Sequence, residues 1–182
     1  MNAAIVPVRV ATLTEQIERI VEVTLAARED EPILANLLEL YIHDFSEFHE
    51  LDIGADGRFG YSSLPLYWSV RGRYPFLVRI DGKLAGLALV KKGGGVSGNA
   101  EAWDMAEFFI LRGYRRRGVG MQTAHEVWKR FRGPWEVRVM ESNVPALHFW
   151  RRAISTFRGE GIQPVDVERD GKSWKVFLFE SQ

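Results

Sequence analysis

The segment that most constrains the fold of this chain is an apolar stretch that leads through an arginine- and glycine-rich turn into an amphipathic helix. The pattern predicts a strand from Met105 to Leu111, a turn with the sequence Arg-x-x-Gly-x-Gly at 115–120, and a helix that ends at Gly133-Pro134. A further apolar run, Trp135 to Met140, predicts a second strand after this helix. Strand, helix and strand in this order indicate a parallel crossover within one sheet.

The other segments add antiparallel strands and helices around this crossover. Asp-Gly pairs at 81–82 and 170–171 supply the positive φ angles of tight hairpin turns. We therefore predict an α/β (α+β) fold, a mixed and mostly antiparallel central sheet of six to seven strands with helices on both faces. We expect a single domain over residues 19–182 and an N-terminal extension over residues 1–18. The further strands are predicted at 21–25, 76–80, 84–90, 165–168 and 174–179, and the further helices from Pro32 to Phe48, over 64–70 and from Pro145 to Phe157.

The balance of charge and the absence of cysteine exclude several classes of function. The chain has 24 basic and 24 acidic residues, so its net charge of zero gives no global attraction to nucleic acid or to a membrane surface. It has no cysteine, which excludes disulfides, thiolate zinc sites and a cysteine nucleophile. No apolar run approaches the ~20 residues that span a bilayer, and residues 1–7 lack the basic start of a signal peptide. We therefore expect a cytoplasmic protein.

The turn at 115–120 has the chemistry of an anion-binding site. Glycines let the backbone approach a ligand closely, and the first N–H groups of a helix carry partial positive charge without an internal acceptor. The arginines of the turn add fixed positive charge that suits a phosphate. The alternative is that Gly118 and Gly120 only relieve a tight turn while the arginines face water.

Two motifs together resemble those of a known family. The Arg-x-x-Gly-x-Gly sequence at 115–120, after the 105–111 strand, resembles the acyl-CoA-binding motif of the GNAT superfamily of N-acetyltransferases. One strand later, Asn143-x-x-Ala146 resembles the Asn-x-x-Ala helix segment of the same superfamily. The order of predicted elements also matches the superfamily from about residue 21 to residue 179.

The resemblance implies that acetyl-CoA is a cosubstrate and that no metal is needed. The turn would hold the pyrophosphate of CoA, and the strand before it would part from the next strand and pair with the pantetheine arm. One amide near Ile110 would polarise the thioester carbonyl. The residues expected to bind the cosubstrate are Phe109, Ile110, Leu111, Arg115, Arg116, Arg117, Gly118, Val119, Gly120 and Asn143.

The resemblance also implies direct attack of an amine on the thioester, without a covalent enzyme intermediate. A protonated amine needs a proton acceptor, and the superfamily often has an acidic residue at the place of Glu107 in the strand. We predict Glu107 and Asn143 as catalytic residues, with Asp104, Glu141 and His148 as further candidate bases. The alternative for Glu107 is a solvated or ion-paired strand residue.

Two positions depart from the superfamily pattern. The seventh residue after Asn143 is usually a tyrosine that can protonate the leaving thiolate, but here it is Trp150, whose indole N–H is far too weak an acid. Tyr114 and His148 are candidate replacements, and a thiolate whose conjugate thiol has a pKa near ~8.5 can also leave unprotonated. Arg112 stands where proline is common, and it adds positive charge to the turn.

Three other patterns predict less specific features. Gly93, Gly95 and Gly98 form a Gly-x-Gly-x-x-Gly run, but no helix follows it, so we interpret it as a mobile hairpin loop rather than a dinucleotide site. The four histidines lack the spacing of a zinc pair, so we expect no metal site. Residues 43–50 give the first long helix an acidic end, which is either a wall of the amine site or a solvated face.

We predict an acetyl-CoA-dependent N-acetyltransferase that acts on a primary amine of a small molecule or a peptide. Two alternatives stay open: a non-catalytic CoA-binding sensor or degenerate acetyltransferase, because of Trp150, and a nucleic-acid-binding module that uses the arginines at 112–117. We expect no nucleic-acid partner and no membrane partner. Aromatic residues over 61–68, expected to be exposed, are candidates for a homodimer contact. The identity of the amine stays open, because acceptor pockets are built from variable loops.

Overall fold

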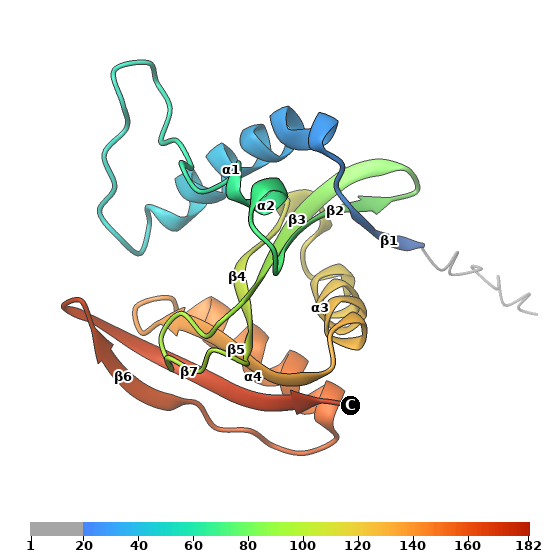
Figure 1. Cartoon of the computed structure of the whole chain (residues 1–182), viewed down its shortest axis with the longest axis vertical. Coiled ribbons are helices and arrows are strands. Elements are labelled where there is room, and N and C mark those ends of the chain that lie inside the picture. The colour runs from blue at the N-terminus through green and yellow to red at the C-terminus, as the bar shows by residue number, and fades with distance from the viewer. Residues whose placement is uncertain (1–19) are drawn as a thin grey trace, which may run out of the picture.

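Over residues 20–182, which the computed structural model describes, the chain forms a seven-stranded sheet with the order β1-β2-β3-β4-β5-β7-β6 (Figure 1). β4 and β5 pair in parallel, and the other neighbouring strands are antiparallel. The predicted extension over residues 1–18 lies outside the described residues. The strands are β1 (Val21–Leu25), β2 (Arg73–Ile80), β3 (Lys83–Lys92), β4 (Trp103–Ile110), β5 (Gly133–Met140), β6 (Val165–Arg169) and β7 (Lys172–Ser181). The helices are α1 (Glu31–Phe45), α2 (Leu66–Ser69), α3 (Val119–Arg130) and α4 (Val144–Arg158), with short 3-10 helices η1 (Arg28–Asp30) and η2 (Arg112–Tyr114).

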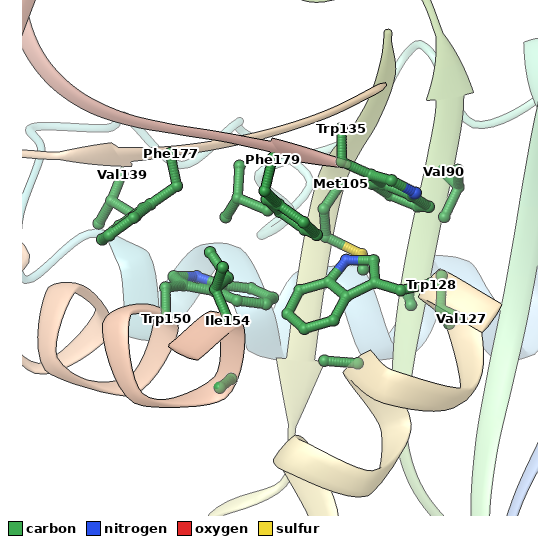
Figure 2. Packing of buried hydrophobic residues seen from close by; sticks show 14 of the residues in the cluster. Val90, Met105, Val127, Trp128, Trp135, Val139, Trp150, Ile154, Phe177 and Phe179 are labelled. Atoms are coloured by element: carbon green, nitrogen blue, oxygen red, sulfur yellow. The ribbon is translucent and has the colours of Figure 1, made fainter. Parts of the chain in front are cut away.

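Helices cover both faces of this sheet, as predicted. On one face, α3 and α4 bring the indole rings of Trp128 and Trp150 against side chains of β5 and β7 (Figure 2). The Trp128 ring lies 5.0 Å from the ring of Phe179 and is fully buried. On the other face, α1 and α2 bury Leu38 and Tyr67 against β2 and β3. Burying each large apolar side chain contributes about 1.5–3 kcal/mol, so both helical layers are fixed to the sheet.

The two predicted hairpin turns are confirmed. Asp81 and Gly82 have φ angles of 49° and 73°, and Asp170 and Gly171 have φ angles of 51° and 69°. Positive φ at both central residues is the geometry that the right-handed twist of paired strands favours in a two-residue turn.

The predicted end of the first long helix at Phe48 is wrong. Helix α1 ends at Phe45, and Phe48 lies in the turn that follows. The hydroxyl of Ser46 donates a hydrogen bond to the carbonyl oxygen of His43 at 2.7 Å. Serine side chains compete in this way with backbone hydrogen bonds. The helix therefore ends before this serine, although the apolar pattern in the sequence continues to Phe48.

The predicted role of Gly133-Pro134 as a helix stop is also wrong, because these residues are the first two of β5. Helix α3 ends earlier, at Arg130, and Phe131 is already extended with φ −126° and ψ 100°. The extended backbone places the Phe131 ring 4.6 Å from the ring of Trp103, so aromatic packing rather than the proline ends the helix. Proline at the first residues of a strand removes few ladder hydrogen bonds.

β4 and β5 part soon after they meet. In the described residues they pair at Trp103 with Trp135 and at Asp104 with Glu136, and the rest of both strands diverges. Figure 1 shows β1–β4 and β5–β7 spreading apart from this point. The divergence leaves backbone edges of β4 without a strand partner and opens a gap in the middle of the sheet.

Candidate active site

Two cavities meet at the gap between β4 and β5. We call the smaller one, of about 360 Å³, the Glu107 cavity, and the larger one, of about 530 Å³, the arginine cavity, because it is lined by Arg112, Arg115 and Arg116. Six residues line both cavities, which makes the two spaces continuous. They are Tyr41, Phe45, Phe108, Asn143, Ala146 and Trp150.

The arginine cavity contains the start of α3. The N-cap of this helix is Gly118, with φ +80°, and it has no side chain to cap the helix. The first backbone bond runs from Gln122 N–H to the Gly118 carbonyl oxygen at 3.0 Å, so the N–H groups of residues 119–121 have no acceptor within the helix. Together with the helix dipole they can bind an anion. Gly120 lines the cavity, where a side chain would press against the Phe149 ring at 3.2 Å.

Two arginines of the turn are held by Asp44 at the end of α1. Arg112 Nη2 lies 2.7 Å from one carboxylate oxygen of Asp44, and Arg115 Nη2 lies 2.6 Å from the other. Desolvation acts to raise the pKa of Asp44, but the hydrogen bonds from both guanidinium groups outweigh it and hold the pKa below its ordinary value. Arg115 Nε also donates to the carbonyl oxygen of Ile110 at 2.6 Å. The Arg115 side chain therefore ties the turn to β4 and α1.

Six of the ten residues predicted to bind the cosubstrate line the arginine cavity. They are Phe109, Ile110, Arg115, Arg116, Gly120 and Asn143, whereas Leu111, Arg117, Gly118 and Val119 do not line it. Arg117 is exposed, and the side chain of Val119 is buried in the core. The Leu111 amide is already used, because it donates to the Ala85 carbonyl oxygen of β3 at 2.8 Å. By strand alternation the backbone of Ile110 faces the opposite side, toward the gap.

Glu107 lies in the smaller cavity as a partly accessible carboxylate. The Tyr61 hydroxyl donates to its Oε1 at 2.9 Å, and Tyr41 also faces it. Burial raises the pKa of Glu107, and the charge of Arg138 and the hydrogen bonds from the two tyrosines only partly offset this effect. Glu107 is therefore a carboxylate that holds a proton more readily than one in water.

A buried ion cluster lies beside Glu107. Arg138 of β5 donates to both carboxylate oxygens of Asp104 and, through Nη2, to the carbonyl oxygen of Ala106 at 3.3 Å. Lys91 Nζ lies 3.4 Å from Asp104, whose side chain is 0% exposed. Burial raises the pKa of Asp104 against the lowering effect of Arg138 and Lys91. The Arg138 side chain thus bridges β4 and β5 where their backbones no longer pair.

The glycine-rich loop between β3 and β4 is attached to the same region by Glu136. The Glu136 side chain is fully buried, and its two oxygens accept hydrogen bonds from the N–H groups of Val96 and Ser97, both at 2.8 Å. A side chain at Gly94 would meet a Glu136 oxygen at 2.7 Å, so this glycine permits the close approach. The loop predicted to be a mobile hairpin loop is therefore held by two charge-assisted hydrogen bonds.

Asn143 and Trp150 lie where the two cavities join. The Asn143 Oδ1 accepts a hydrogen bond from Ala146 N–H at 3.1 Å and so caps α4. The predicted catalytic and binding roles of Asn143 stay predictions. Because its Oδ1 is used in the cap, its side-chain amide nitrogen is the group that a ligand could contact. Trp150 is 7% exposed and packs against Phe108, with ring centroids 4.9 Å apart.

Several candidates from the sequence lie elsewhere. Glu141 is exposed and pairs with Lys175 at 3.0 Å, and His148 is exposed. Neither residue lines either cavity, and the same is true of Tyr114. The structure therefore does not bring these three groups to Glu107. Asp104 is close to Glu107 but is paired with Arg138.

The expectation of exposed aromatic residues over 61–68 is wrong. Tyr67 is 3% exposed in the core beneath α1, because α2 packs its aromatic side chains inward. Tyr61 bonds to Glu107, and the Trp68 indole N–H donates to the Ala26 carbonyl oxygen at 3.1 Å. The homodimer stays a prediction, and the aromatic residues over 61–68 do not support it.

The acidic end of α1 has a role that the sequence did not indicate. Asp44 and Glu47 line the arginine cavity rather than the Glu107 cavity, so this part of the helix borders the anion-binding turn. Within residues 20–182, no group of three His, Asp or Glu side chains is placed to hold a metal ion. No helix in the same range is long and apolar enough to cross a bilayer.

Tyr41, Tyr61 and Arg138 are site residues that sequence reasoning missed. Arg138 had one available signal, because Glu136 and Arg138 alternate with apolar residues in the strand 135–140. Charged side chains at such positions of a central strand are almost never buried without a partner. The two tyrosines had no local signal, since they reach Glu107 only through the packing of α1 and the following loop.

Comparison with known proteins shows the family to which this fold belongs. The model of the acetyltransferase (GNAT) family matches residues 34–154, which is more than half of the chain. The chain therefore belongs to the GNAT acetyltransferase family. A comparison with curated protein sequences finds no match.

Solved structures of the same fold come from distant relatives. An acetyltransferase from Thermus thermophilus is 18% identical, with a TM-score of 0.62 over 88% of this chain and 96% of that one. NAA60 from Arabidopsis thaliana, in complex with a bisubstrate analogue, is 15% identical, with a TM-score of 0.58 over 88% and 98%. A spermidine N-acetyltransferase from Vibrio cholerae, in complex with CoA and spermine, is 15% identical, with a TM-score of 0.58 over 88% and 95%.

Proposed function

We propose that the protein transfers the acetyl group of acetyl-CoA to a primary amine by direct attack on the thioester. One observation carries this proposal. A partly accessible Glu107 carboxylate lies in a cavity that is continuous with the anion-binding turn, at the point where β4 and β5 part. In the proposed reaction, Glu107 accepts a proton at one end of this continuous space, and the turn before α3 binds phosphate at the other end.

The arginine cavity has the groups needed to hold CoA. The amides of residues 119–121 would bind the pyrophosphate, and Arg116, which lines the cavity, would add charge. The gap-facing backbone of Ile110 would pair with the pantetheine arm and present one amide to the thioester carbonyl. The Vibrio cholerae protein of the same fold was solved in complex with CoA, which supports a CoA thioester as the donor.

The Glu107 cavity would hold the amine. An alkylammonium ion cannot attack a thioester, so the proton must first pass to Glu107, directly or through a water molecule. The free amine then forms a bond to the thioester carbon, the oxyanion is stabilised by the amide, and the C–S bond breaks. The nitrogen of the adduct then loses its second proton, which passes through water to the departing thiolate, so that the products are the amide and the CoA thiol. Glu107 returns the first proton to solvent before the next turnover.

The group that meets the leaving thiolate is Tyr41. Among the residues that line both cavities, it carries the hydroxyl group. Burial raises the pKa of Tyr41 well above its ordinary value, whereas a thiol has a pKa near ~8.5. Proton transfer from Tyr41 to the thiolate is therefore uphill. Because Tyr41 donates its one hydroxyl proton to Glu107 before the reaction, we infer that the hydroxyl turns to the thiolate, and stabilises it by a hydrogen bond, once Glu107 has taken up the proton of the amine. Trp150 then needs no acid function.

Replacement of Glu107 by glutamine tests this proposal. General-base catalysis contributes about 10²–10⁴-fold to a rate, so E107Q should lower kcat at least 100-fold. E107Q should also remove the rise of kcat/KM with pH that the ionisation of Glu107 causes, which lies above the pH at which an ordinary carboxyl group ionises. Thiol release from acetyl-CoA with a panel of primary amines measures the rate, and calorimetry should give an acetyl-CoA Kd within about twofold of wild type. E126Q, at a half-exposed site on α3 outside both cavities, is the matched control.

The same measurements separate the alternatives. An unchanged pH profile in E107Q would assign Glu107 to structure. Binding of acetyl-CoA without transfer to any amine would favour the CoA-binding sensor, the alternative that Trp150 suggests. A nucleic-acid module is disfavoured by the pairing of Arg112 and Arg115 with Asp44. The cytoplasmic location stays a prediction.

A further inference from the structure

We propose that the acceptor is a small primary monoamine with an aromatic body, rather than a polyamine or a polypeptide. This inference rests on the proposed function, because it concerns the molecule that the Glu107 cavity takes. Three features of the cavity carry it: an aromatic lining, a single accessible carboxylate at its inner end, and walls that are tied together.

The lining is rich in aromatic rings. Seven of the twenty residues that line the Glu107 cavity are aromatic, and three of them, Phe59, Tyr61 and Trp174, belong to this cavity alone. They come from the loop after α1 and from β7, which are the walls farthest from the donor side. Flat apolar rings favour an aromatic guest through buried apolar area and ring-edge contacts.

The charges of the cavity suit one ammonium group. Its charged lining residues are Glu107, Arg138 and Asp52. Glu107 is the carboxylate beside the junction, and the charge of Arg138 next to it is paired with Asp104, so the inner end offers one carboxylate to one ammonium group. Asp52 is exposed at the outer end, where solvent screens its charge. A polyamine would therefore pair one ammonium group with Glu107. Its other ammonium groups would lie among aromatic side chains without a carboxylate partner, and the loss of their hydration would weaken binding.

Two contacts join the loop after α1 to β7 and to the start of α4, the elements that carry lining residues of the cavity. Lys172 Nζ on β7 lies 3.0 Å from His49 Nε2 on the loop after α1, and Ser142 Oγ donates to the Phe48 carbonyl oxygen at 3.2 Å. A polypeptide acceptor needs a continuous groove along which its backbone can lie. The Glu107 cavity, with a volume of about 360 Å³ at the lower end of small-molecule pockets, is too short for such a backbone.

The loop wall is also held in place before any ligand binds. The carboxylate of Glu39 on α1 accepts hydrogen bonds from Phe59 N–H at 2.8 Å and from Gly60 N–H at 2.9 Å. The Tyr61 hydroxyl is held by Glu107 at 2.9 Å. The aromatic wall is thus preorganised, which lowers the entropy cost of binding a rigid ring.

An amine panel tests the proposal with the full-length protein. Thiol release from acetyl-CoA is measured with 2-phenylethylamine, n-butylamine, spermidine and a tripeptide with a free N-terminus. We expect kcat/KM for 2-phenylethylamine to exceed each of the other three values at least tenfold. An equal or higher value for spermidine or the tripeptide would overturn the acceptor class while the proposed function stands. No transfer to any amine, with acetyl-CoA still bound, would overturn the proposed function and this inference with it.

Truncation of the aromatic wall supplies a second readout. F59A should raise KM for 2-phenylethylamine about tenfold and leave KM for n-butylamine and for acetyl-CoA within about threefold. Phe59 is only partly buried, and W174L gives an independent test from the opposite wall. L40A, which truncates a half-exposed residue of α1 outside both cavities, is the control. Equal loss for both amines in F59A and W174L would contradict an aromatic acceptor.

Discussion

Removal of the Arg138 charge tests how the parted strands are held. The substitution Arg138→Met keeps most of the apolar stem but leaves Asp104, which is 0% exposed, with Lys91 as its remaining partner at 3.4 Å. Breaking a buried ion pair by removing one partner costs about 3–5 kcal/mol. We therefore expect R138M to lower the free energy of unfolding by this amount at pH 8.

The pH dependence of this loss has a defined sign. Without the guanidinium group, the pKa of Asp104, already raised by burial, rises further above its unfolded value. A raised carboxyl pKa means that stability is greatest at low pH and is lost as pH rises from the unfolded toward the folded pKa, by up to about 1.4 kcal/mol per pH unit. The deficit of R138M should therefore be smaller at pH 5 than at pH 8.

Urea unfolding followed by tryptophan fluorescence measures the deficit, because Trp128 and Trp135 are fully buried. The double variant R138M/D104N should lose the pH-dependent part of the deficit, since no carboxylate is left to ionise. A deficit below about 1 kcal/mol, or one equal at both pH values, would refute the reasoning. Arg138 also lowers the pKa of Glu107, so R138M should shift the pH–rate profile to higher pH.

Two further predictions concern the loop wall and the anion-binding turn. E39A removes the carboxylate that holds Phe59 N–H, and it should raise KM for the amine at least fivefold without changing KM for acetyl-CoA; E29A, at an exposed site, is the control, and equal effects would contradict a wall function. G118A places a side chain at φ +80°, which costs about 1–2 kcal/mol, so the free turn should relax to another backbone conformation and regain the binding geometry only at this cost. Calorimetry should therefore show an acetyl-CoA Kd about tenfold higher, whereas G161A, without positive φ, should leave it unchanged. An unaltered Kd in G118A would place the phosphate elsewhere.

Much of the fold follows from local patterns. The hairpins at Asp81-Gly82 and Asp170-Gly171 and the crossover from β4 through α3 to β5 were predicted because turn residues and apolar periods act over a few residues. The glycine-rich turn at 115–120 was recognised for the same reason, whereas Glu107 was proposed only through the resemblance to the GNAT superfamily. Errors fell at the ends of α1 and α3, where a serine hydroxyl and an aromatic contact outweigh the helical period.

The contacts that complete the site join residues far apart in the chain. Tyr61 and Glu107 are 46 positions apart, and Lys172 and His49 are 123 positions apart. The pairing of Arg115 with Asp44 adds a contact that holds the turn to a residue whose predicted role in binding phosphate stays a prediction. No local pattern carries such information, because these distances depend on how α1 and its loop pack across the sheet.

The sequence by itself determined most strands and helices and the glycine-rich turn before α3, since each depends on propensity, periodicity or backbone freedom within a short segment. Only the tertiary structure decided which groups surround Glu107 and how the amine cavity is closed. The physical reason is the early parting of β4 and β5, which opens a gap that side chains from α1, the following loop, β5 and β7 then line.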